Sequence, residues 1–354
     1  MRLSALLAPD RRYALLLGFA LLFGGVLSAS AQSQNRLKPE FALRHAGCVS
    51  SVAFSPDGKL LAVAYGDEDT SGGLALWDLV TGKLVWRTAK RRTFTQVAFL
   101  GDGSRILSLD YFDKRYPMQI WDVKTHALLT AAPNPKHLSI HTFAVAPDGA
   151  TVALGVGDFE ADQPSAILLW NVKTGVTRPV ALLPYTDGVI ALSFSPDGKR
   201  IAGAGGDWDS DVSEVKICDL RTRRTVTDIV NCEEGSVSQL AFSPKGDMLA
   251  VGGDFIGLRD GRGDLKHRLK LTDDRPAIAF SPDGETLAAS DLDQNGRTIV
   301  KIWRIGTRRL GTVMRMNGAQ INDLSISPHR RLLAVARQDG NVQLWRLTPS
   351  RKHE

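Results

Sequence analysis

The chain of 354 residues has few cysteines and no local signature of haem attachment or zinc binding. Its three cysteines, Cys48, Cys218 and Cys232, form neither a Cys-x-x-Cys-His motif nor a zinc-ligand spacing. An exported protein could oxidise one pair, but an odd count leaves one thiol over. We therefore expect packing, rather than disulfides, to hold the fold together.

The chain has only a small excess of positive over negative charge, and it has few long apolar runs. The formal net charge is +6, which is too small to indicate nucleic-acid binding, so we expect no nucleic-acid partner. The one marked apolar run, Tyr13–Val26, is shorter than the roughly 20 residues that span a bilayer. Three arginines precede this run, and the small-residue pattern Ala29-Ser30-Ala31 follows it. This arrangement is typical of a secretory signal peptide over residues 1–31, with Gln32 as the mature start.

The N-terminus therefore predicts an exported protein, either periplasmic or extracellular. Removal of residues 1–31 lowers the formal net charge to +4. An uncleaved signal would instead retain the protein at a membrane, whereas no insertion is expected after cleavage. No cysteine stands at the cleavage point, so nothing indicates a lipoprotein.

What the sequence has in abundance is internal repetition. A motif of the type Phe-Ser-Pro-Asp-Gly occurs seven times, at Phe54–Gly58, Phe99–Gly103, Val145–Gly149, Phe194–Gly198, Phe242–Gly246, Phe280–Gly284 and Ile326–Arg330. The copies are 38 to 49 residues apart, which is the spacing of four-stranded propeller blades. Within the motif, proline presets a turn and glycine accepts positive φ, so each copy predicts a tight turn between two strands.

A second signature follows each turn at a matching phase. Five repeats carry a tryptophan there, namely Trp77, Trp121, Trp170, Trp303 and Trp345, whereas Ile217-Cys218-Asp219 and Gly257-Leu258-Arg259 are degenerate copies. A stacking or cofactor site would be one interpretation of these indoles. Because they recur once per repeat, we interpret them as core between neighbouring blades, with Cys218 as a small core residue.

These paired motifs resemble those of the WD-repeat family, over nearly all of residues 40–347. The family also carries a Gly-His dipeptide before the first strand of each repeat, but here only His45 stands at that phase. The resemblance therefore implies that the buried His–Asp network of the family is mostly absent, and with it the polar bonding inside each blade.

The resemblance implies an all-β fold, a seven-bladed β-propeller of four-stranded antiparallel blades. One repeat cannot bury its faces alone, so stacked neighbours supply the core. By resemblance to the family, the N-terminal strand should complete the last blade and close the ring, leaving no free edge. The expected domains are the signal peptide 1–31, a linker 32–37, the propeller 38–348 and a C-terminal tail 349–354. We expect a monomeric ring.

The strand order places the Pro-Asp-Gly and Thr-Gly turns on one face of the disc, the turn face, and the longer loops on the other, the loop face. Long loops on a rigid scaffold are common binding sites, and aromatic residues among acids suit protein interfaces. We therefore predict that the loop face binds a protein or peptide, or else that its acids are merely solvated. The candidate residues are Asp67, Glu68, Asp69, Tyr111, Phe112, Asp113, Phe159, Glu160, Asp207, Trp208, Asp209, Asp211, Asp291 and Asp293. The turn face is rich in lysine and arginine and is expected to be a soluble surface, with an anionic partner as the alternative.

One loop invites a metal hypothesis. Asp291-x-Asp293-x-Asn295-Gly296 matches the start of a calcium loop, but Ile302 stands where an EF-hand places its last ligand. We therefore expect solvated turn acids and no metal site.

A propeller enzyme or a small-ligand binder centred on the ring channel is the alternative function, and it predicts a bound metal or cofactor, or a polar pocket on the axis. Some propellers are lactonases or quinone-cofactor enzymes with chemistry at the central channel, which requires convergent acids, histidines or a metal. The seven histidines of this chain are scattered over different loop phases, and no nucleophile-elbow, zinc-protease or phosphate-loop motif occurs. We therefore predict a non-catalytic scaffold without a cofactor.

Overall fold

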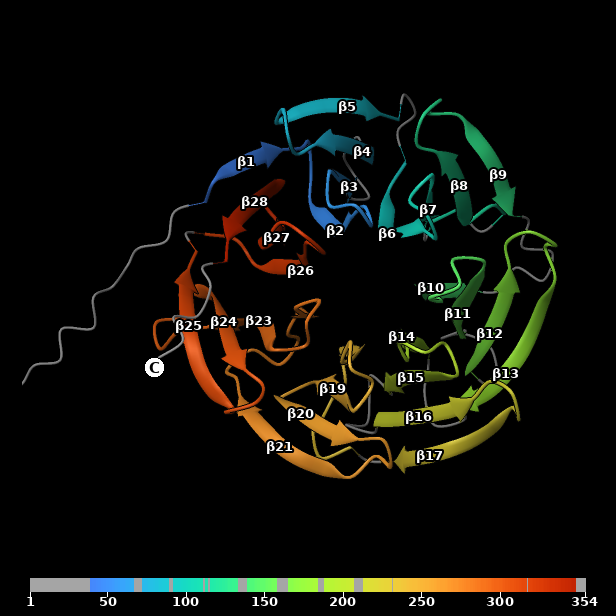
Figure 1. The fold of residues 1–354 in the computed structure, drawn as a ribbon, viewed down its shortest axis with the longest axis vertical. Coiled ribbons are helices and arrows are strands. Elements are labelled where there is room, and N and C mark those ends of the chain that lie inside the picture. The colour runs from blue at the N-terminus through green and yellow to red at the C-terminus, as the bar shows by residue number, and fades with distance from the viewer. Residues whose placement is uncertain are drawn as a thin grey trace, which may run out of the picture. The chain divides into compact units, whose positions relative to one another are not determined.

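The computed structural model describes the ring in residues 39–66, 72–88, 92–110, 112–113, 115–132, 139–157, 165–183, 188–206, 213–230, 232–316 and 318–347. These residues belong to one compact unit, Arg36–Glu354. They form seven four-stranded antiparallel sheets, arranged as blades around a common axis (Figure 1). The predicted seven-bladed β-propeller is confirmed.

The strands follow one another blade by blade, from the inner strand to the outer strand. Blade 1 contains β2 (Val49–Phe54), β3 (Leu60–Tyr65), β4 (Gly73–Asp78) and β5 (Lys83–Arg87). Blade 2 contains β6 (Phe94–Leu100), β7 (Arg105–Asp110), β8 (Met118–Asp122) and β9 (Leu128–Ala132). Blade 3 contains β10 (Ser139–Val145), β11 (Thr151–Gly157), β12 (Ser165–Asn171) and β13 (Thr177–Leu183). Blade 4 contains β14 (Val189–Phe194), β15 (Arg200–Gly206), β16 (Ser213–Asp219) and β17 (Arg224–Val230).

The last three blades complete the ring. Blade 5 contains β18 (Gln239–Phe242), β19 (Met248–Gly252), β20 (Phe255–Asp260) and β21 (Leu265–Lys270). Blade 6 contains β22 (Ile278–Phe280), β23 (Thr286–Leu292), β24 (Thr298–Arg304) and β25 (Arg309–Arg315). Blade 7 contains β26 (Ile321–Ile326), β27 (Leu332–Arg337), β28 (Asn341–Arg346) and the N-terminal strand β1 (Phe41–Arg44).

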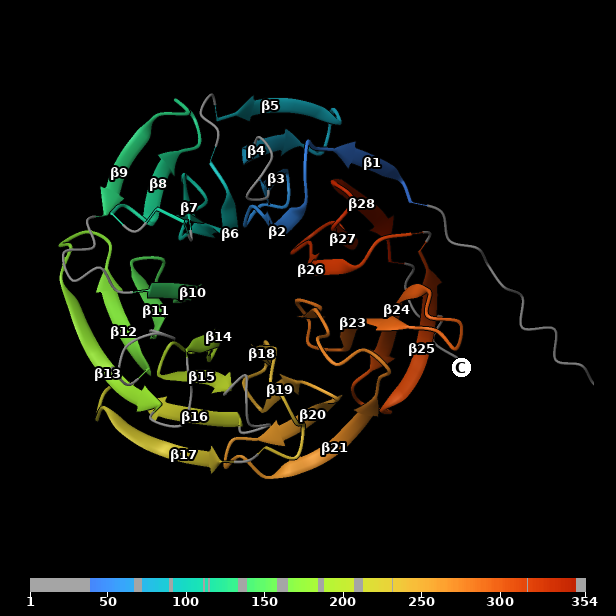
Figure 2. The ribbon, with the colours of Figure 1, turned by 180° about the vertical axis from the view of Figure 1, so that it is seen from behind.

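The ring closes through the N-terminal strand, as the resemblance implied. Strand β1 pairs antiparallel with β28, with Phe41 opposite Leu344 and Arg44 opposite Asn341. On the inside, β26 of blade 7 lies beside β2 of blade 1 (Figure 2). The pairing places the first and last described strands in one sheet, and β1 covers the edge of β28.

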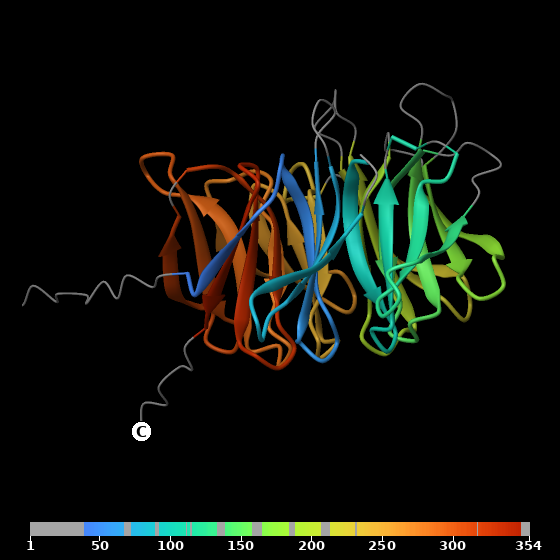
Figure 3. The same cartoon turned by 90° about the horizontal axis from the view of Figure 1, so that it is seen from above.

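The Pro-Asp-Gly turns are held by their own side chains. In the first turn, the Ser55 hydroxyl donates to the Asp57 carboxylate at 2.6 Å, and Gly58 adopts a φ of +68°. The same serine-to-aspartate bond recurs at Ser195 and Ser281. Because the strands of every blade alternate in direction, the equivalent turns of the blades lie along one edge of the disc in the side view (Figure 3).

The core consists of seven apolar clusters, and each cluster joins two neighbouring blades. Trp170, Trp303 and Trp345 are buried in three of them, while Trp77 and Trp121 pack half-buried against two others. The tryptophans thus fill the spaces between blades, as predicted. Cys218 occupies the corresponding position in blade 4 and is fully buried. None of the three cysteines forms a disulfide with another described residue.

The resemblance implied that polar bonding inside each blade is mostly absent. In some blades, however, residues other than a His–Asp pair form such bonds. His45 packs against the rings of Tyr65 and Trp77, and its Nε2 has no hydrogen-bond partner among the described residues. Burial lowers the pKa of His45 to about 4. In blade 5 the tryptophan position is occupied by Arg259, and not by Leu258 as the sequence copy predicted. Arg259 forms two hydrogen bonds, of 2.7 and 2.6 Å, with the buried carboxylate of Glu234.

No helix in the part of the chain that the structure describes is long and apolar enough to cross a membrane.

Candidate functional site

Four of the fourteen loop-face candidates belong to the described residues, namely Phe112, Asp113, Asp291 and Asp293. The other candidates lie outside the described residues: Asp67, Glu68, Asp69, Tyr111, Phe159, Glu160, Asp207, Trp208, Asp209 and Asp211. The site is therefore built from the four and from the residues that hold them.

Phe112 follows β7 and presents an exposed aromatic side chain, with 49% of its surface accessible. The backbone on either side of it is fixed by Arg92, whose guanidinium donates to Asp113 at 2.6 Å and to Asp110 at 3.2 Å. The Asp113 carboxylate also accepts the backbone N–H groups of Arg115 and Tyr116. A cation in the link that enters blade 2 thus orders the segment that carries the aromatic side chain.

The two carboxylates that hold Arg92 differ in environment. Burial raises the pKa of Asp110, and its bonds to Arg92 offset this only in part. Burial also acts to raise the pKa of Asp113, but hydrogen bonds from Arg92 and from two backbone N–H groups outweigh it, so this pKa is lowered. Asp113 therefore stays ionised and keeps the arginine in place.

Asp291 is a correction to the predicted loop face. It lies inside β23 rather than in a loop, its side chain is fully buried, and it forms an ion pair with Lys301. Its carboxylate also accepts the backbone N–H groups of Thr272 and Asp273, at 2.7 and 3.0 Å, in the link that enters blade 6. Asp291 cannot contact a partner from this position, because neighbouring strands and the link cover it.

Asp293 belongs to the tight turn between β23 and β24, where its carboxylate accepts the backbone N–H groups of Asn295 and Arg297. These bonds lower the pKa of Asp293. Since Asp291 is paired with Lys301 and Asp293 caps its own turn, the two acids do not form a shared calcium site. Among the described residues, no group of three acidic, histidine or cysteine side chains is placed to hold a metal ion.

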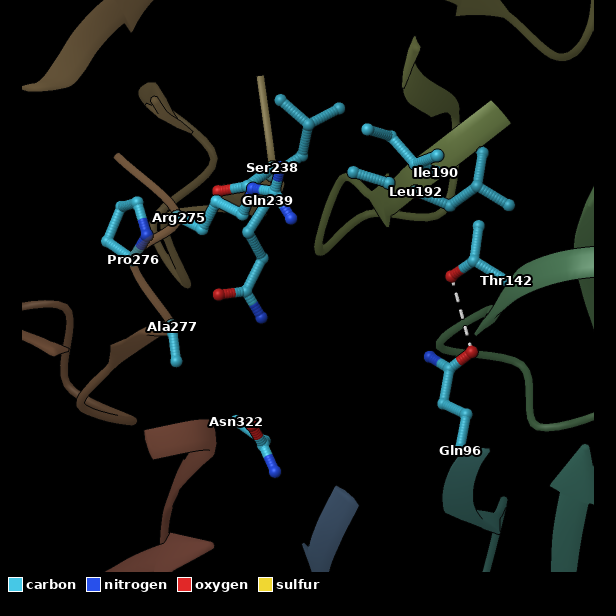
Figure 4. Close-up of a pocket in the computed structure, with 12 residues that line it drawn as sticks. Gln96, Thr142, Ile190, Leu192, Ser238, Gln239, Arg275, Pro276, Ala277 and Asn322 are labelled. Atoms are coloured by element: carbon cyan, nitrogen blue, oxygen red, sulfur yellow. Dashed lines mark hydrogen bonds between the residues drawn. The ribbon is translucent and has the colours of Figure 1, made fainter. Parts of the chain in front are cut away.

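A second feature lies on the ring axis, where the alternative function places a polar pocket, although the sequence did not name the residues that form it. A cavity of about 210 Å³ is lined by residues in or just before the first half of six inner strands, those of blades 2 to 7. This half of each strand is the one nearer the loop face. Ile190 and Leu192 of β14 form an apolar wall, and the carboxamides of Gln96, Gln239 and Asn322 supply polar groups (Figure 4).

The three carboxamides also connect blades. Gln96 accepts the N–H of Phe143 and donates to the carbonyl of the same residue, both at 2.9 Å, which ties blade 2 to blade 3. The oxygen of Gln239 accepts the N–H of Ile278 in blade 6, and the nitrogen of Asn322 donates to the Val49 carbonyl in blade 1 at 2.9 Å. The Gln239 amide nitrogen and the Asn322 amide oxygen form no hydrogen bond with another described residue, so they offer a donor and an acceptor to a molecule in the cavity.

The sequence did contain a signal for these inter-blade bonds. Gln96, Gln239, Ser51 and Asp323 each stand three residues before the last inner-strand residue of the turn motif. The side chain of each accepts a backbone N–H from the next blade, namely that of the residue after the equivalent position there. Asp323, for example, accepts the N–H of Val52 at 2.9 Å. A polar residue recurring at this phase of an otherwise apolar strand marks a position that faces the axis and bonds across blades.

Comparison with known families agrees with the architecture. The family model of the WD domain, G-beta repeat, matches residues 37–78, 178–213, 225–256 and 310–346. Each match includes residues of the outer strand of one blade and continues into the next blade, so the sequence repeat is offset from the blade by one strand. No curated protein matched the chain. Four matching repeats within a closed ring of seven four-stranded blades together support a WD-repeat β-propeller.

Proposed function

We propose that this protein is an exported, non-catalytic scaffold that binds a protein or peptide through the loop face of the ring. Propellers with WD repeats commonly mediate protein interactions. A rigid ring that displays segments between strands suits this role, since binding residues are usually carried by loops on a fixed framework. The signal-peptide pattern of residues 1–31 supports export.

The observation that carries the proposal is the exposed Phe112 on a segment ordered by Arg92, Asp110 and Asp113. An aromatic side chain is an effective interface anchor, and it loses little conformational entropy on binding when its backbone is already held. Nothing in the packing of the blades requires such a side chain to face solvent, because burial would be the more favourable state for it.

The test replaces Tyr111, Phe112 and Trp208 by alanine and measures binding to a partner captured from the native envelope or secretome. We expect at least about a tenfold loss of affinity, the size of a modest interface hot spot, with an unchanged melting temperature. The matched control replaces the exposed Val80 and Val176 by alanine, since both lie in turns of the opposite face. Full binding by the aromatic variant would refute the assignment of the site.

A small polar ligand in the axial cavity is the second candidate. The lining residues offer amides, hydroxyls and one arginine but no carboxylate, histidine or thiol, so they suit hydrogen-bonded recognition rather than acid–base chemistry. Elemental analysis and mass spectrometry of the purified protein test for a bound metal or small molecule. If a molecule copurifies, Gln239→Leu should release it, while Gln343→Leu, away from the lining residues, should retain it.

A further inference from the structure

The turn face differs between blades at the residue that follows the tryptophan position. In blades 1 to 5 this residue is Asp78, Asp122, Asn171, Asp219 or Asp260. Each of these side chains accepts backbone N–H bonds of its own turn, as Asp78 does from Val80 and Thr81 at 2.7 and 2.8 Å. Four of the five also place a negative charge beside the cations of the turn. In blades 6 and 7 the same position is Arg304 and Arg346.

Blades 6 and 7 therefore expose arginines that lack the usual acidic neighbour. Arg304, Arg308, Arg309 and Arg331 are exposed, and none of them forms an ion pair with another described residue. The nearest turn of blade 6 does carry two acids, but the Asp283 carboxylate caps its own turn and Glu285 pairs with Lys245 of blade 5. We call these four arginines the arginine patch.

Two arginines of the patch have an unfavourable backbone conformation. Arg308 and Arg331 have φ angles of +59° and +52°. In the turns of blades 1 and 3 that correspond to the turn of Arg308, Gly82 and Gly175 adopt this conformation without a steric penalty. A glycine would serve the turn better than Arg308, so the turn itself does not account for a charged side chain there. Exposed Leu310 adds an apolar group beside the patch.

The N-terminal segment reaches the ring at the same place. Strand β1 starts opposite the turn-face end of β28, where the Glu40 N–H donates to the Leu344 carbonyl and the Glu40 carboxylate pairs with Arg346 at 2.6 Å. The apolar run Tyr13–Val26 precedes Glu40 by only fourteen residues. In the precursor, sequence connectivity thus joins the membrane-directed segment to the blade that carries part of the arginine patch.

We propose that the arginine patch docks the turn face of blades 6 and 7 on an anionic phospholipid surface. Guanidinium groups bind phosphate oxygens through paired hydrogen bonds, and basic residues near an anionic bilayer each add to the attraction. The tips of short turns lie along one edge of the disc (Figure 3), which suits contact with a flat surface. In the precursor, before residues 1–31 are removed, the apolar run adds a second membrane signal to that of the patch, and in the mature protein the patch acts alone.

The experiment measures binding of the protein, purified from the expressing cell, to vesicles of phosphatidylcholine with and without phosphatidylglycerol. The variant Arg304→Gln, Arg308→Gly, Arg309→Gln, Arg331→Asn removes the patch, with glycine and asparagine chosen because they tolerate positive φ. The matched control Lys173→Gln, Lys199→Gln, Arg221→Gln, Arg223→Gly removes the same charge from blades 3 and 4. Like the patch variant, it replaces an arginine that has a left-handed backbone conformation, since Arg223 has a φ of +55°.

We expect the wild-type protein to prefer the anionic vesicles, and salt to weaken that preference. The patch variant should lose about fivefold in partition for each arginine removed, whereas the control variant should bind nearly as well as the wild type. Equal binding to both kinds of vesicle, equal losses in the two variants, or stronger capture of an RNA oligonucleotide than of the anionic vesicles would each overturn the proposal.

Discussion

Blades 1 and 5 fill the same position between neighbouring blades in opposite ways. In blade 1, Trp77 lies opposite Leu61 of β3 and packs edge-on against the ring of His45. In blade 5, Arg259 lies opposite Leu249 of β19. Arg259 is neutralised by the buried carboxylate of Glu234 and donates to the Gly263 carbonyl at 2.8 Å. An aromatic cluster and a closed ion pair thus occupy equivalent sites in one ring.

The difference shows which property of the repeat is fixed. The position between blades must be filled and electrically neutral, but it need not be apolar. The two solutions tolerate change differently, because loss of part of an aromatic cluster leaves a cavity, whereas loss of one ion leaves the other buried and unpaired. Blade 5 also carries Gly257 where blade 1 has Ala75, since the Glu234 carboxylate takes the space of a Cβ atom.

The largest expected effect comes from breaking the ion pair. Glu234→Ala leaves Arg259 buried without a counter-ion and should lower the free energy of unfolding by about 3 to 5 kcal/mol, as measured by chemical denaturation. The double variant Glu234→Leu, Arg259→Met should recover most of this loss, because uncharged side chains of similar volume remove the unpaired charge. A loss below about 1 kcal/mol in the single variant, the scale of an exposed pair, would mean that the pair is not truly buried.

A pH-dependent effect of about 3 kcal/mol is expected where blade 7 meets blade 1. Although part of the Asp323 residue reaches solvent, its carboxylate is buried, and burial raises its pKa from 3.8 to about 6. The folded state therefore binds a proton before the unfolded state does, so this group adds stability as the pH falls from about 6 to about 4. His45 acts in the opposite direction between pH 6.5 and about 4, because burial lowers its pKa.

In the wild-type protein the two effects largely cancel, and substitution separates them. Asp323→Asn should fall further below the wild type in unfolding free energy as the pH is lowered from 7 to 4, because only the loss from His45 remains. The matched variant His45→Phe should gain relative to the wild type over the same range. Parallel pH profiles for the three proteins would contradict the buried carboxylate.

A smaller effect should come from adding a methyl group to blade 5. Gly257→Ala places a Cβ atom against the Glu234 carboxylate and should cost about 1 to 3 kcal/mol, as overpacking in a core does. In the Glu234→Ala background the same substitution should cost much less, which a double-mutant cycle would detect. Additive losses would show that the methyl group and the carboxylate do not compete for the same space.

The smallest effect extends the comparison to the turns. Blade 1 uses Gly82 in the left-handed conformation, whereas blade 6 uses Arg308. Arg308→Gly should stabilise the protein by about 0.5 to 1 kcal/mol, because relief of the left-handed penalty exceeds the extra chain entropy of glycine in the unfolded state. Calorimetry should show a higher melting temperature, and an unchanged or lower value would indicate that the Arg308 side chain makes a stabilising contact.

Much of the architecture could be predicted from the sequence, because the same turn and tryptophan motifs recur at a regular spacing. The turn motifs placed the hairpins, and the recurring indoles placed the interfaces between blades. The candidate site was less accessible to prediction. Asp291 was placed in a loop because its neighbours resemble a calcium loop, yet β23 continues through it and Lys301 neutralises it. The axial carboxamides were missed because they sit singly on otherwise apolar strands.

The sequence by itself determined the number of blades and the phase of the strands, since these follow from local turns and from a core that only stacked repeats can bury. Closure of the ring by the N-terminal strand followed from the resemblance to the family. The tertiary structure alone decided which charges are neutralised, which carboxylates are buried and which amides face the axis. Those outcomes depend on residues far apart in the chain, such as Asp323 and Val52, and on the dielectric environment that their packing creates.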